Sequence, residues 1–254
     1  MPIRYSFARI EDYATIFAPF VLNSDMTTSD TRALRTKILK IHRLLLETYG
    51  EPPRPRLDPV SELVSTILSQ NTNDTLRDRA YHRLRERYPT WEGVRDAPVR
   101  EIVKAVRVCG LAQQKGPRIK KALRHITRER GELDLSFLGE MPIGEARHWL
   151  MSIEGVGPKT AAIVLLFALN SPAFPVDTHV HRVTGRLGLI PPKTSADKAH
   201  QILEDLVPPE VYLPFHLNII LHGRQVCHAR KPACEACVLR RLCRYYAEVI
   251  KLGD

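Results

Sequence analysis

Four cysteines near the C-terminal end of the chain have a spacing that could bind a metal ion or an iron–sulfur cluster. They read C-x6-C-x2-C-x5-C at Cys227, Cys234, Cys237 and Cys243. Four thiolates hold either a tetrahedral zinc ion or a cubane iron–sulfur cluster. Zinc sites usually combine two short Cys-x2-Cys pairs, and this segment has only one, so the spacing favours a four-iron cluster and leaves zinc open. The fifth cysteine, Cys109, follows valines and is interpreted as a core residue.

A lysine follows directly after a glycine turn that could bind phosphate. The turn Gly155-Val156-Gly157 precedes Pro158, which suits the first position of a helix. The amides of such a turn, with the positive end of the next helix, bind an anion without any side-chain charge. Lys159 therefore has two interpretations, an imine-forming amine nucleophile or a contact to a phosphate. The local sequence leaves both open.

The composition indicates a polyanionic partner. The chain of 254 residues carries a formal net charge of +10, with a pI near 9.6, which favours nucleic acid over membrane. No apolar run reaches the roughly 18 residues of a membrane span, and the N-terminus does not resemble a secretory signal. The clustered cysteines argue against a secreted disulfide scaffold. We expect an intracellular protein of the cytoplasm or nucleoid, without membrane contact.

Helical periodicity runs through the chain, and no segment reads convincingly as a strand. Asp58-Pro59 is typical of a helix cap followed by a first-turn proline. The glycine turn should join two helices into a helix-hairpin-helix unit, and residues 131–142 should form an irregular connector. The sequence therefore predicts an all-α fold, with helices over 31–49, 59–69, 76–88, 99–108, 115–130, 146–153, 158–169, 178–188, 195–207 and 213–224.

Three motifs in order resemble the endonuclease III family of helix-hairpin-helix DNA glycosylases, over about residues 30–246. They are the hairpin with Lys159, the segment Pro175-Val176-Asp177-Thr178-His179, and the cysteine loop. The resemblance implies that Lys159 forms a Schiff base with the sugar and that Asp177 is the other essential group. It implies a [4Fe–4S] cluster on the four cysteines and a monovalent cation at the hairpin. The expected protein is a monomeric base-excision-repair DNA N-glycosylase and abasic-site (AP) lyase, with double-stranded DNA containing a damaged base or an abasic site as partner.

The same resemblance assigns the residues that contact DNA. A glycosylase must flip its target nucleotide, because C1′ is unreachable inside the duplex. Gln70 resembles the family's inserting glutamine and Leu111 its apolar wedge, although the residues alone favour a helix C-cap and a core leucine. Asp177 is also expected to cap a helix, where its carboxylate would stabilise a developing cation or take the proton of Lys159. Further expected DNA contacts are Gly155, Val156, Gly157, Thr160 and His179.

The resemblance implies two helical domains with DNA in the cleft between them. A six-helix domain with the helix-hairpin-helix would span 57–170. The iron–sulfur domain would be discontinuous, built from 31–56 and 171–254. Residues 1–30 would form an N-terminal extension.

Some positions depart from the family pattern and leave the target base open. Glu154 stands where the family usually has proline before the first hairpin glycine, and Gln70-Asn71-Thr72 differs from the usual sequence after the inserting glutamine. The latter stretch also resembles the plant 5-methylcytosine glycosylases. An oxidised pyrimidine is the expected target, with mismatched thymine or uracil and modified cytosine as alternatives. Two rival functions are a non-catalytic iron–sulfur DNA-binding protein and a monofunctional mismatch glycosylase. The pair Lys159 and Asp177 counts against the first, and Lys159 counts against the second.

Overall fold

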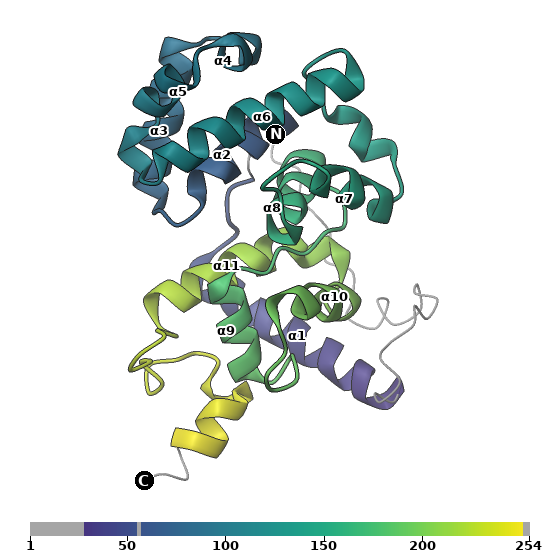
Figure 1. Ribbon diagram of the computed structural model, residues 1–254. Helices are drawn as coiled ribbons and strands as arrows, with labels where there is room; N and C mark the ends of the chain where they lie inside the picture. The colour runs from purple at the N-terminus through teal and green to yellow at the C-terminus, as the bar shows by residue number, and fades with distance from the viewer. Residues whose placement is uncertain (1–27, 55–56, 251–254) are drawn as a thin grey trace, which may run out of the picture.

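The computed structural model describes residues 28–54 and 57–250, and every regular element within these ranges is helical. The predicted all-α class is confirmed (Figure 1). None of these helices is both long enough and apolar enough to cross a bilayer. The helices are α1 (Thr28–Tyr49), α2 (Pro59–Ser69), α3 (Asp74–Arg87), α4 (Trp91–Asp96), α5 (Val99–Ala105), α6 (Ala112–Arg130), α7 (Ile143–Met151), α8 (Pro158–Ile163), α9 (Thr178–Leu187), α10 (Ala196–Leu206) and α11 (Tyr212–Gln225).

The structure differs from the predicted helices at three places. The short helix α4 was not predicted, because six residues that include Gly93 carry little helical periodicity. The connector 131–142 contains the 3₁₀ turn Ser136–Glu140. The apolar run after the hairpin is not one α-helix, since α8 passes into a π-helical turn over Val164–Ala168. Of the predicted extension 1–30, only residues 28–30 lie within the described part of the chain, and they open α1.

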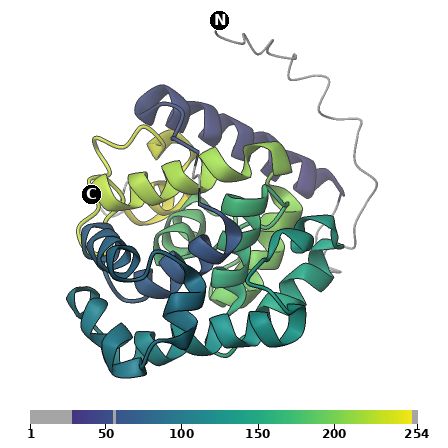
Figure 2. The same cartoon turned by 90° about the horizontal axis from the view of Figure 1, so that it is seen from above.

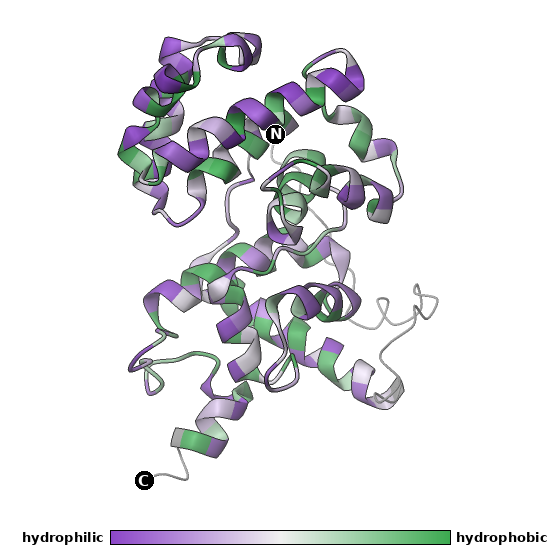
Figure 3. Ribbon diagram, viewed as in Figure 1, coloured by the Kyte–Doolittle hydropathy of each residue, from purple (hydrophilic) through white to green (hydrophobic). Residues whose placement is uncertain are grey.

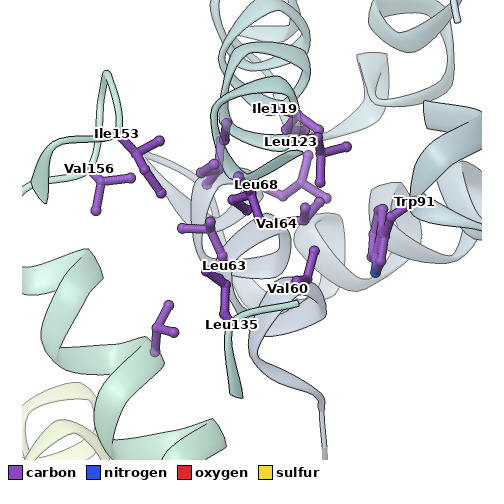
Figure 4. Close-up of a cluster of buried hydrophobic side chains, with 14 of the residues drawn as sticks. Val60, Leu63, Val64, Leu68, Trp91, Ile119, Leu123, Leu135, Ile153 and Val156 are labelled. Carbon is purple, nitrogen blue, oxygen red and sulfur yellow. The ribbon is translucent and has the colours of Figure 1, made fainter. Parts of the chain in front are cut away.

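The helix α2 is the centre of the first of two hydrophobic clusters. Asp58 caps it by accepting a hydrogen bond from Ser61 N at 2.9 Å, as expected from the sequence. All of its residues from Pro59 to Leu68 are buried. Figure 4 shows Val64 and Leu68 of this helix next to Ile119 and Leu123 of α6, with Leu63 on the side of Leu135. Because α2 is surrounded on all sides, its C-terminal end is held firmly where it leaves the core.

The buried side chains form two clusters, one in each lobe of the molecule (Figures 1 and 2). The hairpin lobe comprises α2 to α8, and the cysteine lobe comprises α1, α9, α10, α11 and the C-terminal loop. In both lobes apolar residues lie inward and polar residues cover the outer helix faces (Figure 3). Two ion pairs join the lobes, Arg147 to Glu204 at 2.7 Å and Arg224 to Asp74 at 2.6 Å. The hairpin therefore lies in one lobe and the cysteines in the other.

Candidate functional site

The helix-hairpin-helix is formed by α7, a turn through Gly157, and α8. The turn closes on itself where Val156 N donates to Ile153 O at 3.0 Å. The amides of Gly155 and Gly157 donate to no acceptor within residues 28–54 and 57–250. Both donors lie at the N-terminal end of α8, where the helix dipole is positive. The hairpin can therefore bind an anion through its main chain.

The two glycines of the turn are required for different reasons. Gly155 has φ +85°, and a Cβ there would lie 3.2 Å from Arg118 Cδ, so the fold itself needs a glycine. Gly157 has φ −98°, which any residue adopts, and a Cβ there would meet nothing within 4 Å. What the missing side chain of Gly157 provides is open space at the backbone. Close approach of a ligand to the main chain needs that space.

The hairpin packs beside the first part of α6 and the end of α2. Gln70 Nε2 donates to Gly155 O at 3.4 Å, and Arg118 Nη1 donates to Gln70 Oε1 at 3.0 Å. Lys121 Nζ lies 2.7 and 2.8 Å from the two carboxylate oxygens of Glu154. The acidic residue that departs from the family pattern is thus paired with a cation, which reduces its repulsion of DNA.

Lys159 and Asp177 stand at the starts of two different helices. Lys159 lies in the first turn of α8 and is exposed. Asp177 caps α9, since its Oδ1 accepts from Val180 N at 2.7 Å, which confirms the expected cap. Its Oδ2 accepts from no group in the described ranges. The cap thus holds the carboxylate in one orientation and leaves the second oxygen available to a ligand.

A buried histidine, His216, is sensitive to the charges of both Lys159 and Asp177. His216 of α11 is 1% exposed, and its ring packs edge-on against Phe167 and Phe174. Burial lowers the pKa of His216 to about 4, while the charge of Asp177 raises it and that of Lys159 lowers it. Both charges therefore act on the same imidazole. The amine and the carboxylate, 18 positions apart in the sequence, thus share one electrostatic environment around this ring.

The predicted DNA contacts divide into accessible and inaccessible side chains. Leu111 is 45% exposed, so the core-leucine interpretation is wrong. Gln70 does cap the C-terminus of α2, and its amide also reaches the hairpin. Val156 and Thr160 are each 6% exposed, so a contact of these two residues with DNA would have to be made by the main chain. The amide of Val156 is used inside the turn, so only its carbonyl remains for a cation.

His179 connects the site to the start of the cysteine loop. Its Nδ1 lies 3.0 Å from Arg182 Nη2, and Arg182 Nε donates to Cys227 O at 3.0 Å. Burial lowers the pKa of His179, which Asp177 opposes. The Cβ that an alanine would place at Gly223 would lie 3.1 Å from His179, so α9 and α11 approach closely here. His179 is held by its neighbours and does not project freely.

The four cysteines of the loop surround a hollow in the cysteine lobe. It is lined by Cys227, Cys234, Cys237 and Cys243, together with Tyr245 and Tyr246. The empty volume of this hollow, including the part that is open to solvent, is about 290 Å³. Arg186 Nη1 lies 3.2 Å from Cys227 Sγ and donates to His228 O at 2.6 Å. His222 Nε2 lies 3.4 Å from Cys237 Sγ, and its Nδ1 bonds Tyr49. Both ring nitrogens of His222 are thus engaged by neighbouring side chains.

The donor set fits a cluster better than a single ion. In the described residues no three His, Cys, Asp or Glu side chains converge to hold one metal ion, so the four thiols surround a space without meeting at a point. A cubane takes one thiolate at each iron and needs such a separation. Burial, with the other cysteines adding to it, raises the pKa of Cys237 to about 11. Four thiolates in one hollow therefore require the positive charge that iron supplies.

Several residues of the site were not predicted from the sequence. Asp74 bonds both Arg224 and Arg77, and it feels the charge of Lys159. A histidine on an apolar helix face is the signal that pointed to His216, while Arg118 carries no signal because basic residues are frequent on α6. These side chains become part of the site only when the two lobes pack.

Comparison with known proteins agrees with the residue geometry. Residues 64–209 match the HhH-GPD superfamily of base excision DNA repair proteins, and residues 227–243 match the iron–sulfur binding domain of endonuclease III. Endonuclease III of Sulfolobus acidocaldarius is 36% identical over 191 residues, covering 74% of this chain and 83% of that protein. Endonuclease III of Thermotoga maritima is 33% identical over 208 residues, covering 81% and 93%.

Among solved structures, the chain is similar to a trapped endonuclease III–DNA covalent intermediate. The sequence identity is 28%, the TM-score is 0.71, and the match covers 89% of this chain and 99% of the other. Nearly the whole of that protein is thus represented here, including both lobes.

Proposed function

Because this chain belongs to the endonuclease III family of DNA glycosylase/AP lyases, we propose that Lys159 is its nucleophile and Asp177 its catalytic carboxylate. The observation that supports this assignment is that the charges of both groups act on the buried ring of His216. Imine formation at a sugar requires an accessible amine and a carboxylate that can take up its proton.

The reaction begins when the amine of Lys159 attacks C1′ of a flipped nucleotide. The bond from C1′ to the base nitrogen breaks, and the base leaves with the electron pair and takes up a proton. The Oδ2 of Asp177 faces the positive charge that develops at C1′ and accepts the proton lost by Lys159. The C1′–O4′ bond of the sugar ring then breaks, O4′ takes up a proton, and the nitrogen lone pair forms the C1′ iminium. The iminium makes the protons on the 2′ carbon acidic. Loss of a 2′ proton then breaks the C3′–O bond and nicks the strand by β-elimination.

The duplex is held by main-chain and side-chain groups around the hairpin. The free amides of Gly155 and Gly157 bind a phosphate, and the turn carbonyls, including that of Val156, bind a monovalent cation. Gln70 and the exposed Leu111 enter the space left by the flipped nucleotide. The hydrogen bond of Gln70 to Gly155 O and the exposure of Leu111 support this role, because an inserting group must be accessible and near the bound phosphate.

The target is an oxidised pyrimidine in this proposal, on the strength of the endonuclease III relatives. Mismatched thymine or uracil and modified cytosine are the alternatives that the experiment below separates. The enzyme acts where the genome lies, in the nucleoid. We assign 57–170 to the helix-hairpin-helix domain and 31–56 with 171–254 to the iron–sulfur domain; the two hydrophobic clusters support this division.

The protein carries the [4Fe–4S] cluster of its family, and Cys227, Cys234, Cys237 and Cys243 are the proposed ligands. When bound, the cluster supplies covalent cross-links and positive charge to the loop. Arg186 and His222 already contact two of these sulfurs. The cysteines lie in the lobe opposite the hairpin, so the cluster has a structural role in the proposed reaction.

The assignment is tested by borohydride trapping on end-labelled duplexes. The duplexes bear an abasic site, thymine glycol, dihydrouracil, 5-methylcytosine, or a G·T or G·U mismatch. The wild type should form a covalent adduct on the abasic site and on its preferred lesion. Lys159→Ala should form none and still bind the abasic duplex within a few fold.

Retained nicking by Lys159→Ala would overturn the nucleophile assignment. The lesion trapped fastest identifies the target, and a mismatch or 5-methylcytosine in that place would replace the oxidised pyrimidine. Each preparation should contain iron and sulfide in the ratio of a [4Fe–4S] cluster. A colourless preparation with zinc would reject the ligand assignment.

A further inference from the structure

Lys115 of α6 is a buried cation whose hydrogen-bond partners are all uncharged. Its side chain is 1% exposed and lies inside the hairpin lobe. The ammonium donates to Leu68 O at 2.8 Å and to Cys109 O at 3.0 Å, and it lies 3.6 Å from Cys109 Sγ. Burial lowers the pKa of Lys115, which Cys109 opposes. A buried charge without a carboxylate partner is costly, so the bonds it makes need an explanation.

The two carbonyls belong to residues that come shortly before Gln70 and Leu111, the two residues proposed to enter the DNA. Leu68 belongs to the last turn of α2, two residues before Gln70. Cys109 ends the 3₁₀ turn Arg107–Cys109, two residues before Leu111. Carbonyls at helix ends lack a partner within the helix, so each needs an outside donor. One ammonium supplies both, and thereby links two turns that are distant in the sequence.

The position of Lys115 is itself closely determined. Gly110 and Leu111 both have positive φ, +68° and +50°, which turns the chain sharply into α6. At Gly116 a Cβ would lie 2.7 Å from Val103 Cγ2, so only glycine lets α6 approach α5 this closely. One turn further along α6, Arg118 bonds the side-chain oxygen of Gln70. The start of α6 therefore has little freedom to shift.

We propose that Lys115 is a positioning residue that holds the turns of Gln70 and Leu111 in one register, so that both side chains enter the duplex together. The proposal rests on the insertion roles proposed above for these two residues. Lys115 touches neither substrate nor the reacting atoms, and it acts only through the two turns. Without its charge the two carbonyls repel one another and each turn can move independently.

The same helix offers a matched control. Lys120 is 8% exposed and also donates to main-chain carbonyls, those of Ala97 and, at 3.5 Å, Asp96. These carbonyls end α4, at a turn that carries neither Gln70 nor Leu111. Lys120→Met thus removes a buried amine of the same kind without loosening either inserting turn.

The experiment uses the full chain and a duplex with 2-aminopurine opposite a tetrahydrofuran abasic analogue. Displacement of the opposite base by the inserting residues changes the fluorescence, whichever lesion the enzyme prefers. We expect Lys115→Met to reduce the rate of this change by about tenfold, since small misplacements of a positioned group have large effects. Lys115→Arg should restore the rate. Lys120→Met should keep the wild-type rate even if it lowers thermal stability as much as Lys115→Met does.

The variants Gln70→Ala and Leu111→Ala test the insertion roles separately from the positioning role of Lys115. If neither slows the fluorescence change, the insertion roles fail, and the inference about Lys115 fails with them. If both slow it and Lys115→Met does not, the inference alone is overturned. Equal losses in Lys115→Met and Lys120→Met would show a general structural role and also overturn it. Should Lys115→Met not fold, Lys115→Gln is measured against the same criteria, because it removes the charge and keeps a donor.

Discussion

At the scale of single residues, Asp177 combines two tasks in one side chain. One oxygen caps α9 through Val180 N, and the second has no partner in the described residues. A cap fixes the carboxyl group relative to the helix, so the free oxygen points in a defined direction. Lys159 lies at the start of another helix, and its side chain is long and exposed, so its amine can change position. The carboxylate is thus the fixed member of the pair and the amine the mobile one.

Asp177→Asn separates the cap from the charge. Asparagine caps helices about as well as aspartate, so thermal stability should change little. The negative charge is lost, and single-turnover base excision should slow by about 100-fold or more. Asp177→Ala, which loses both functions, should in addition lose about 1 kcal/mol of stability. An Asp177→Asn variant with undiminished excision would show that the carboxylate acts only as a cap.

At the scale of elements, the hairpin depends on what surrounds it. Its amides are free because the turn satisfies itself with a single internal bond, Val156 to Ile153. Helix α6 supports it from the side with Arg118 and Lys121, and α2 with Gln70. The residues proposed to hold phosphate and to enter the duplex therefore share one supporting helix, α6. A change in α6 should affect both.

The two hairpin glycines predict different outcomes for the same substitution. Gly155→Ala forces alanine to φ +85° and presses on Arg118, so the free energy of unfolding should fall by about 1–2 kcal/mol. Gly157→Ala meets no strain and no contact, so the fold should be unaffected, while affinity for an abasic duplex falls because the new methyl group keeps phosphate away. Urea unfolding and fluorescence anisotropy at one salt concentration measure the two effects. Equal stability losses in both variants would contradict the distinction.

At the scale of the whole molecule, the two proposed catalytic groups come from different lobes. Lys159 starts a helix of the hairpin lobe, and Asp177 starts a helix of the cysteine lobe. The lobes are joined by the ion pairs of Arg147 with Glu204 and Arg224 with Asp74. The charges of both groups act on His216, whose Nδ1 is buried and has no partner among the described groups. Such a ring stays neutral, because a charge there would be buried without compensation.

The buried imidazole makes folding stability depend on pH. The pKa of His216 is lowered from 6.5 to about 4 by burial, and that of His42 likewise. Below about pH 6.5 the unfolded chain therefore binds protons that the folded chain does not, so the free energy of unfolding falls as pH falls toward 4. Glu62 and Glu204, whose pKa values burial raises, act in the opposite direction.

Comparison with the variant His216→Phe separates the effect of His216 on the pH dependence of stability from the effects of Glu62 and Glu204. Between about pH 7.5 and pH 5, the wild type should lose about 2 kcal/mol more unfolding free energy than the variant. Urea unfolding at the two pH values measures the difference. Identical losses would mean that His216 is not kept neutral by the fold.

The sequence by itself determined the chemistry of this protein. Lys159, Asp177 and the cysteines were identified from residue types, spacing and family resemblance, and the helices followed from apolar periodicity and from caps such as Asp58. These signals are local, because a cap or a glycine turn depends on a few adjacent residues. Only the tertiary structure decided which distant residues meet. It buried His216 and Thr160, exposed Leu111 and joined two turns through Lys115. The packing of lobes and helices sets such contacts, and no short stretch of sequence encodes that packing.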